Sequence, residues 1–368
     1  MNDEVPYWTA FNYVKGIGAV RFSRLLEYFG SAEKAWNADV SELRLSGLPE
    51  KVLSILIKFR ENTDPQVLLN SIESKGIHVC ILTDSSYPKM LKEINNPPPV
   101  LYVVGKIPSS DQKFVAVVGT RRMTNYGREM ANQLSSFLAE NGIVIVSGLA
   151  RGIDGVAHQA ALNSGGKTVA VLGSGVNIIY PPEHRNLAAQ IVHNNGAVIS
   201  DYAPDTPPDK INFPLRNRII SGLSSACLVI EAGEKSGSLI TARFAAEQGR
   251  EVFVVPGNFN APQSRGANRL IRDGARPLFE KKELLEFLQT YEADNPVYLS
   301  KPLQMSFEDE EEKRILDIID VNEMHIDEIS RISGIPVGKV TSKMLLMELK
   351  GFVEEVFPGV YKKKQDAC

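Results

Sequence analysis

Five segments in the middle of the chain combine glycines with arginine, lysine or amide side chains. They are residues 117–122 (VVGTRR), 147–158 (SGLARGIDGVAH), 172–177 (LGSGVN), 213–220 (FPLRNRII) and 231–241 (EAGEKSGSLIT). We interpret them as turns that follow strand-like apolar runs. Glycine lets a ligand approach the backbone closely, and the first N–H groups of a following helix attract an anion. Several such turns along one sheet edge predict a long groove suited to phosphates, which is a more specific signal than one glycine-rich turn.

The distribution of charge indicates a local anion-binding site rather than a uniformly basic surface. The net charge of −3 argues against a protein that covers nucleic acid through charge alone. Residues 111–276, however, hold 17 lysines and arginines against 13 acidic residues. The arginines concentrate in the glycine turns and in residues 265–276, and a cleft can focus such charge on an anion. The alternative is that these arginines are ordinary solvated surface residues.

The remaining bulk properties predict a cytoplasmic protein. A chain of 368 residues has room for two or three domains. It contains no apolar run of about 18 residues, and its first residues lack the basic and apolar regions of a signal peptide. Cys80, Cys227 and Cys368 are far apart and odd in number, which favours reduced thiols over disulfides or a metal site.

The elements that would position the glycine turns alternate between strand and helix patterns. The predicted strands are Phe114–Val118, Ile143–Ser147, Thr168–Leu172, Ala197–Ser200, Cys227–Glu231 and Glu251–Val255. The predicted helices are Gly127–Glu140, Gly152–Asn163, His184–Asn194 and Ser238–Gln248. Strands without polar alternation, separated by helices, predict an α/β fold with a doubly wound parallel sheet covered on both faces. Ligands of such sheets bind outside the carboxyl ends of the strands, where the glycine turns fall.

Two helical hairpins are predicted before this sheet. Tyr7–Val14 and Ala19–Phe29 are joined by the turn of residues 15–18 (KGIG), and a second turn leads into Lys51–Arg60. This is the pattern of a helix-hairpin-helix or SAM-like domain, which we place at residues 1–66. Such a hairpin can present N–H groups to a nucleic-acid phosphate. An ordinary helical hairpin, whose glycines only permit the tight turn, explains the pattern equally well.

The main domain is predicted to span residues 67–290. Within it, residues 76–82 (GIHVCIL) and 100–104 (VLYVV) have strand-like patterns and are separated by prolines at 88 and 97–99. Because proline cannot donate to a central ladder, we expect an ordered connector that adds edge strands to the main sheet.

A linker at residues 291–307 precedes a last domain at residues 308–368. That domain has apolar residues spaced for one helix, then a helix, a turn and a second helix at residues 326–350, and a hairpin at residues 353–362. This is the pattern of a small winged helix. Its second helix offers Lys339, Thr341, Ser342, Lys343 and Lys350. Two roles stay open for it, a protein-contact or regulatory role and contact with DNA.

In order and length, the central motifs resemble those of the DprA (Smf) family of DNA-processing proteins. The similarity covers residues 76 to about 279 and adds GKTVAVLGSGVNIIYPPEHRNL, ISDYAPDTPP, VIEAGEKSGSLITARFAAEQGREVFVVPG and GANRLIRDGA to the turns above. The terminal domains fit the long form of the family. The resemblance implies an extended Rossmann-like domain that binds single-stranded DNA, without enzymatic activity or a cofactor. It also implies a homodimeric recombination mediator that loads the recombinase RecA onto incoming DNA in natural transformation, displacing or bypassing single-strand-binding protein.

The family's DNA-binding residues can be placed on the matching motifs. Arg121 and Lys210 are the expected phosphate contacts, and Phe213 is a candidate for stacking on a base, a contact worth about 1–3 kcal/mol. A core anchor is the alternative role of Phe213. Of Arg216 and Arg218, one is expected to face the groove and the other to hold the loops together. The full set of expected contacts is Gly119, Thr120, Arg121, Lys210, Phe213, Arg216, Asn217, Arg218, Ser236, Gly237 and Ser238.

A second set of residues is expected to support the groove. These are Gly148, Arg151, Gly152, Asp154, His158 and Glu231. Asp154 and His158 are four residues apart at a helix start, which is compatible with a metal or acid–base pair. We favour a structural role for both, in which Asp154 caps the helix and bonds neighbouring loops. Glu231 and Glu234 could be catalytic, but carboxylates beside a phosphate site also orient arginines.

Two classes of enzyme use a similar sheet. Nucleoside-monophosphate phosphoribohydrolases use a similar sheet, but they need a carboxylate where this chain has Ile240 and Thr241. A nicotinamide-dependent oxidoreductase would have an acidic residue after the second strand to bind a ribose hydroxyl, and this chain has Ser147 and Gly148 there. Binding is therefore favoured over catalysis.

The homodimer is implied by the resemblance alone. The segment Gly266–Phe279 is the candidate interface, since it mixes Leu270, Ile271, Leu278 and Phe279 with basic residues. Burial of these apolar residues inside the domain is the alternative.

Overall fold

The computed structural model describes residues 3–291, 310–319, 324–349, 352–357 and 359–363, which belong to two compact units, Met1–Leu303 and Gln304–Cys368. The predicted linker lies outside these residues except for Tyr291. The division after residue 66 stays a prediction, and that position falls within helix α6 (Pro65–Glu73). Among the described helices, none is both long enough and apolar enough to cross a membrane.

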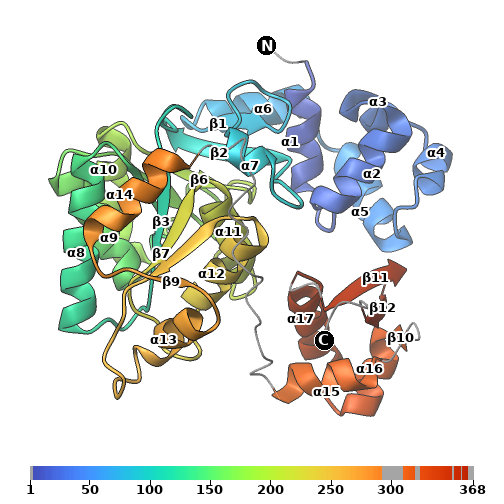
Figure 1. Ribbon diagram of the computed structural model, residues 1–368. Coiled ribbons are helices and arrows are strands. Elements are labelled where there is room, and N and C mark those ends of the chain that lie inside the picture. The colour runs from blue at the N-terminus through green and yellow to red at the C-terminus, as the bar shows by residue number, and fades with distance from the viewer. Residues whose placement is uncertain (1–2, 292–309, 320–323, 350–351, 358, 364–368) are drawn as a thin grey trace. The chain divides into compact units, whose positions relative to one another are not determined.

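Helices form the start of the first unit (Figure 1). Besides α6 they are α1 (Val5–Tyr13), α2 (Ala19–Phe29), α3 (Ala32–Asn37), α4 (Val40–Leu45) and α5 (Glu50–Arg60). The ring centroids of Trp8 and Phe22 lie 4.7 Å apart, and those of Phe11 and Trp36 lie 5.3 Å apart. These aromatic residues belong to the same hydrophobic core as Tyr102 of the sheet. The helical segment is thus fixed to the sheet by a continuous apolar core.

The predicted first hairpin connects α1 with α2. Gly16 in this turn has φ 98°, a value that favours glycine. A Cβ atom at Gly16 would lie 2.9 Å from Val52 Cγ2 of α5, so the turn packs directly on the second hairpin. Whether the hairpin contacts a phosphate stays a prediction.

The main sheet has nine strands in the order β1-β2-β6-β5-β4-β3-β7-β8-β9. Their bounds are β1 (His78–Ile81), β2 (Val100–Gly105), β3 (Phe114–Val118), β4 (Val144–Ser147), β5 (Thr168–Val171), β6 (Ala197–Ser200), β7 (Ala226–Val229), β8 (Glu251–Val254) and β9 (Arg276–Pro277). Neighbouring strands from β6 to β9 are parallel, whereas β2 pairs antiparallel with both β6 and β1. The predicted parallel sheet and its added edge strands are confirmed.

Helices cover both faces of the sheet. They are α7 (Lys89–Lys92), α8 (Asn125–Glu140), α9 (Ile153–Asn163), the short 3-10 helix η1 (Pro182–His184), α10 (Arg185–His193), α11 (Asn212–Gly222), α12 (Ser238–Glu247), α13 (Arg265–Arg272) and α14 (Lys281–Thr290). Figure 1 shows α8, α9 and α14 on one side of the strands, with α11 and α12 on the other. Residues of α8, α9 and α14 share one apolar core with β3, β4, β7 and β8. The doubly wound arrangement is therefore confirmed.

One segment was predicted wrongly. Residues 213–220 were interpreted as a turn, yet they lie within helix α11. Pro214 is the third residue of this helix. The first N–H groups of a helix have no intrahelical partner, so proline removes no hydrogen bond at this position.

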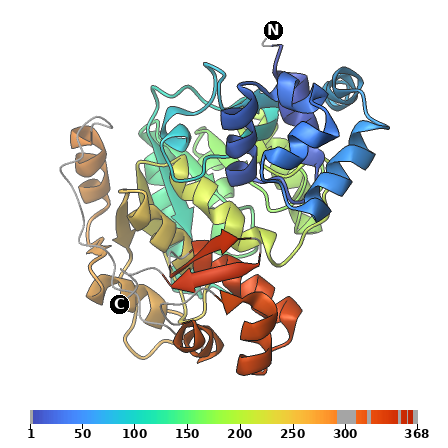
Figure 2. The same ribbon diagram turned by 90° about the vertical axis from the view of Figure 1, so that its right-hand side faces the viewer.

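The second unit is a winged helix, as predicted. It consists of α15 (Glu310–Ile318), β10 (Met324–His325), α16 (Ile326–Ser333), α17 (Val337–Leu349), β11 (Val353–Phe357) and β12 (Val360–Lys363), with strand order β10-β12-β11. Figure 2 shows these elements from a second direction. Lys339 and Lys343 of α17 form ion pairs with Glu311 at 2.6 and 3.0 Å, so both lysines are engaged within the unit. Lys350 lies outside the described residues.

Candidate functional site

The predicted glycine turns meet at the carboxyl edge of the parallel strands. Strands β3 and β7 are neighbours in the sheet, although β4, β5 and β6 lie between them in the sequence. This is the point at which the strand order reverses, where doubly wound sheets bind ligands. Gly119 follows β3 directly, and a Cβ atom on it would lie 2.5 Å from Ile153 of α9. The close approach of turn and helix at this point therefore depends on glycine.

Glu231 joins the β3 and β7 turns. The Thr120 N–H donates to the Glu231 carbonyl oxygen at 2.7 Å. The Glu231 carboxylate accepts from the Thr124 N–H at 2.8 Å and from the Thr124 hydroxyl at 2.7 Å. Glu231 is 3% exposed. Both carboxylate oxygens therefore hold the loop that leads into α8, and the role of Glu231 in supporting a groove stays a prediction.

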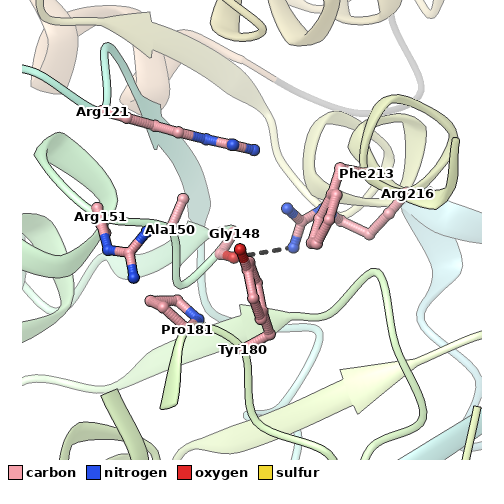
Figure 3. A pocket seen from close by; sticks show the side chains of 8 residues that line it. All are labelled: Arg121, Gly148, Ala150, Arg151, Tyr180, Pro181, Phe213 and Arg216. Atoms are coloured by element: carbon pink, nitrogen blue, oxygen red, sulfur yellow. Dashed lines mark hydrogen bonds between the residues drawn. The ribbon is translucent and has the colours of Figure 1, made fainter. Parts of the chain in front are cut away.

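The turns enclose a pocket (Figure 3). It is lined by Arg121, Gly148, Ala150, Arg151, Tyr180, Pro181, Phe213 and Arg216. The guanidinium carbon of Arg121 lies 5.6 Å from the centre of the Phe213 ring. The ring centroids of Phe213 and Tyr180 lie 5.5 Å apart with an interplanar angle of 39°. An exposed cation and two partly exposed aromatic rings therefore stand side by side at the pocket.

Arg216 forms the buried floor of the pocket. Its Nη1 donates to the carbonyl oxygen of Gly148 at 2.9 Å and also to that of Val171, so it ties the ends of β4 and β5 together. A Cβ atom on Gly148 would lie 2.7 Å from Arg216 Nη2 and 2.8 Å from Asp154 Oδ2, so only glycine fits between these side chains. Burial lowers the pKa of Arg216 to about 10, which leaves it charged at neutral pH.

Asp154 is the anionic counterpart of Arg216. Its Oδ2 accepts from the Gly148 N–H at 3.1 Å and from the Ala150 N–H at 3.4 Å. Burial raises the pKa of Asp154, and the charge of Arg216 and the two N–H donors oppose that rise. These contacts bond the neighbouring loop, but the prediction that Asp154 caps the helix is wrong, because Gly152 is the N-cap of α9 and no side chain caps it.

Arg218 lies away from the pocket, on another side of α11. It donates to the Asn96 carbonyl oxygen and to Asp201 Oδ2, both at 2.8 Å. Of the two arginines, Arg216 lines the pocket and Arg218 holds loops together. Asn217 between them donates from Nδ2 to the Gly237 carbonyl oxygen at 3.2 Å, which links α11 to the start of α12.

The remaining expected contacts lie along the same edge. Lys210 is exposed just before α11, and it makes no ion pair within the described residues. Ser236 and Ser238 hydrogen bond to each other through their hydroxyls at 2.8 Å, with Gly237 between them as the N-cap of α12. Arg151 is exposed at the pocket rim, where its Nε donates to Glu183. Lys210, Gly237 and Arg151 are exposed, whereas Ser238 is buried, and the roles of all these residues in binding stay predictions.

His158 does not face the pocket lining. It is fully buried, and its Nδ1 lies 2.6 Å from the Thr168 hydroxyl, which itself donates to the Ile145 carbonyl oxygen. Burial lowers the pKa of His158 to about 3, so the ring is neutral at neutral pH. Because the Thr168 hydroxyl already donates to Ile145, the His158 Nδ1 is the donor between them and carries the proton. Across the described residues, no group of three or more His, Cys, Asp or Glu side chains is arranged to hold a metal ion.

Sequence reasoning did not single out Tyr180, Glu183 or Asp201. Tyr180 and Glu183 lie in a segment that was quoted for the family resemblance, NIIYPPEHRNL. The tyrosine before two prolines was the available signal, because an aromatic ring in a proline-rich turn is held in place and can pack on a ligand. Glu183 and Asp201 were not recognisable because their ion-pair partners, Arg151 and Arg218, lie in other segments of the chain.

Two family models match this chain. The model of DNA recombination-mediator protein A matches residues 78–289, and the DprA winged helix domain matches residues 301–356. The chain belongs to the DprA family. Protein Smf of Synechocystis sp. is 35% identical to it over 98% of this chain and 98% of that protein. The DNA processing protein DprA of Bacillus subtilis is 39% identical over 69% of this chain and 89% of that protein.

Two solved structures of the family resemble the fold. The X-ray structure of DNA processing protein A from Streptococcus pneumoniae has a TM-score of 0.65 and 32% identity, and the match covers 78% of this chain and 98% of that chain. A structure of DNA processing protein A from Helicobacter pylori, described for its single-stranded DNA binding mode, has a TM-score of 0.52 and 33% identity. That match covers 58% of this chain and 95% of the other.

Proposed function

We propose that this protein binds single-stranded DNA along the carboxyl edge of its sheet and acts as a recombination mediator. The observation that carries the proposal is the exposed guanidinium of Arg121 over the ring of Phe213. Phosphate contact and base stacking are the two interactions that hold single-stranded nucleic acid without sequence preference. The single-stranded DNA binding described for the Helicobacter pylori relative supports the same assignment.

In this proposal the protein binds DNA as follows. Arg121, Lys210 and Arg151 contact phosphates, and Phe213 with Tyr180 supports a base. The Gly237 N–H at the start of α12 adds an anion contact, whereas the N–H groups of Ser236 and Ser238 already donate to the Gly233 carbonyl oxygen and the Ser236 hydroxyl. Arg216 is too buried to meet DNA freely, so it preorganises the turns that hold the other groups. Phosphate contacts carry no sequence information, so sequence preference should be weak.

The finer role that we propose is loading of RecA onto incoming single-stranded DNA in a transforming cell, with displacement or bypass of single-strand-binding protein. We also propose a cytoplasmic homodimer. The description of the matching family model as a recombination mediator supports the first part. Leu270 and Leu278 of the candidate dimer segment are buried inside the unit, whereas Phe279 is 76% exposed and available to a second copy.

The alternative of a phosphoribohydrolase gains no support from the pocket. Its lining residues within the described chain include no carboxylate. Glu231 of the β7 turn uses both carboxylate oxygens to hold Thr124. We therefore assign no catalytic role to any residue.

Fluorescence anisotropy with labelled oligo-dT tests the proposal. We expect salt-sensitive binding that single-stranded DNA competes better than duplex DNA. Arg121→Ala and Lys210→Ala should each weaken binding and lower the slope of log affinity against log salt by about 0.7, the value for one phosphate contact on a single strand. Lys106→Ala is the control, because this exposed lysine follows β2 at the opposite edge of the sheet. Unchanged affinity in both groove variants would place the site elsewhere.

A further inference from the structure

The loop between β8 and α13, residues 255–264, lies at the same sheet edge as the proposed groove but outside it. Two contacts fix its position. The Tyr126 hydroxyl of α8 donates to the Pro256 carbonyl oxygen at 3.0 Å. A Cβ atom on Gly233, in the turn after β7, would lie 3.3 Å from the Pro262 carbonyl oxygen. The loop therefore continues the row of turns that begins after β5.

This loop is held by its own hydrogen bonds. Asn268 of α13 bonds Gly257 twice, accepting from its N–H and donating to its carbonyl oxygen, both at 3.1 Å. The Ala261 N–H donates to the Asn258 carbonyl oxygen at 3.0 Å, and the Ser264 N–H donates to the Ala261 carbonyl oxygen at 2.9 Å. The loop is thus closed at its base and across its tip.

Phe259 stands at the tip of this loop and is 87% exposed, the largest exposed fraction of any large hydrophobic side chain that the structure describes. Two exposed cations lie on neighbouring turns of the same edge, Arg122 after β3 and Lys235 after β7. Neither forms an ion pair with another described residue. An exposed aromatic ring that shares a sheet edge with unpaired cations fits a base and its phosphates better than it fits an apolar protein surface, which would need a contiguous apolar patch.

We propose that Phe259 is a second base-stacking platform, and that Arg122 and Lys235 guide the DNA backbone toward it. The inference rests on the proposed single-stranded DNA binding and extends that site. Phe213 packs against Gly173 at the end of β5, and four strand steps separate β5 from β8. With strands about 4.8 Å apart, the two platforms lie about 19 Å from each other along the sheet edge. The full groove therefore holds a longer strand than the pocket around Phe213 alone.

The test measures oligo-dT binding over a series of lengths for three variants of the full chain. Phe259→Leu keeps an apolar side chain and removes the ring, so we expect affinity to fall about five- to 140-fold for long oligonucleotides and not at all for the shortest ones that bind. Phe259→Tyr keeps the ring and should bind as the unmodified protein does. Phe259→Trp provides a direct signal, because long oligo-dT should quench the added fluorescence. Trp8 and Trp36 are buried and contribute a constant background.

The outcomes separate the two proposals. If the unmodified protein binds no single-stranded DNA, the proposed function fails. If it binds, but Phe259→Leu has the same affinity at every length and Phe259→Trp fluorescence is unchanged, this inference alone is overturned. Phe259 would then be left for a protein partner, and the groove would end before β8. A ring-dependent loss that begins only beyond a threshold length supports the extended groove.

Discussion

Replacement of Arg216 by methionine tests how the site is built. Arg216 is 3% exposed, and Asp154, its anionic neighbour, is 7% exposed. Methionine fills most of the same volume but leaves Asp154 without its counter-charge. It also leaves the carbonyl oxygens of Gly148 and Val171 without the guanidinium donor.

The expected size of the effect follows from this geometry. Arg216 and Asp154 are opposite charges that are both buried, and removing one of two such charges costs up to about 3–5 kcal/mol because the other stays buried and uncompensated. We therefore expect Arg216→Met to lower the free energy of unfolding by about 3–5 kcal/mol at neutral pH. Adding Asp154→Asn removes the stranded charge, so the double variant should regain at least about 1 kcal/mol.

Urea denaturation followed by tryptophan fluorescence measures this change. Trp8 and Trp36 report on the first unit, because both belong to its hydrophobic core. The difference in the free energy of unfolding between the unmodified protein and Arg216→Met should become smaller as the pH falls. Burial raises the folded-state pKa of Asp154, and without Arg216 it rises further, so protonation relieves the variant as pH falls. A loss below about 1 kcal/mol, or strictly additive effects in the double variant, would refute the argument from the two buried opposite charges.

Three further predictions concern the surroundings of the pocket. Glu183→Gln should raise affinity for single-stranded DNA by about two- to fivefold in anisotropy titrations, because it releases Arg151 from an exposed ion pair. His158→Gln should flatten the pH dependence of stability. The folded pKa of His158 is about 3 against 6.5 for the free side chain, so the native protein should lose about 2 kcal/mol between pH 7.5 and pH 5 in urea titrations, and the variant should not. Glu231→Gln should cost about 1–3 kcal/mol and weaken DNA binding, since an amide cannot accept both hydrogen bonds from Thr124.

The sheet was predictable because its strands are buried on both faces. Phe114–Val118 and Ala226–Val229 are fully buried runs, and such runs are easily separated from the amphipathic helices between them. The carboxyl-edge location of the site followed from the glycines that end those strands. The helix at residues 212–222 was missed, because Pro214 and the neighbouring polar residues resemble a turn when tertiary packing is unknown.

The different positions of Arg216, which lines the pocket, and Arg218, which holds loops together, could be predicted only in part. Residues two apart on a helix point to different sides, so one inward and one outward arginine was expected. Which one lies under the pocket depends on Asp154 of α9 and on Asp201, which follows β6. The ion pair of Arg151 with Glu183 and the packing of Tyr180 on Phe213 are long-range contacts of the same kind. Spacing in the sequence carries no information about them.

The most direct test of the account is anisotropy of labelled oligo-dT, competed by unlabelled single-stranded and duplex DNA at two salt concentrations. The account predicts tight binding that weakens steeply as salt rises, a clear preference for single strands, and loss of affinity in Arg121→Ala. Absence of binding at low salt, or binding that salt does not affect, would contradict the phosphate groove at the carboxyl edge of the sheet.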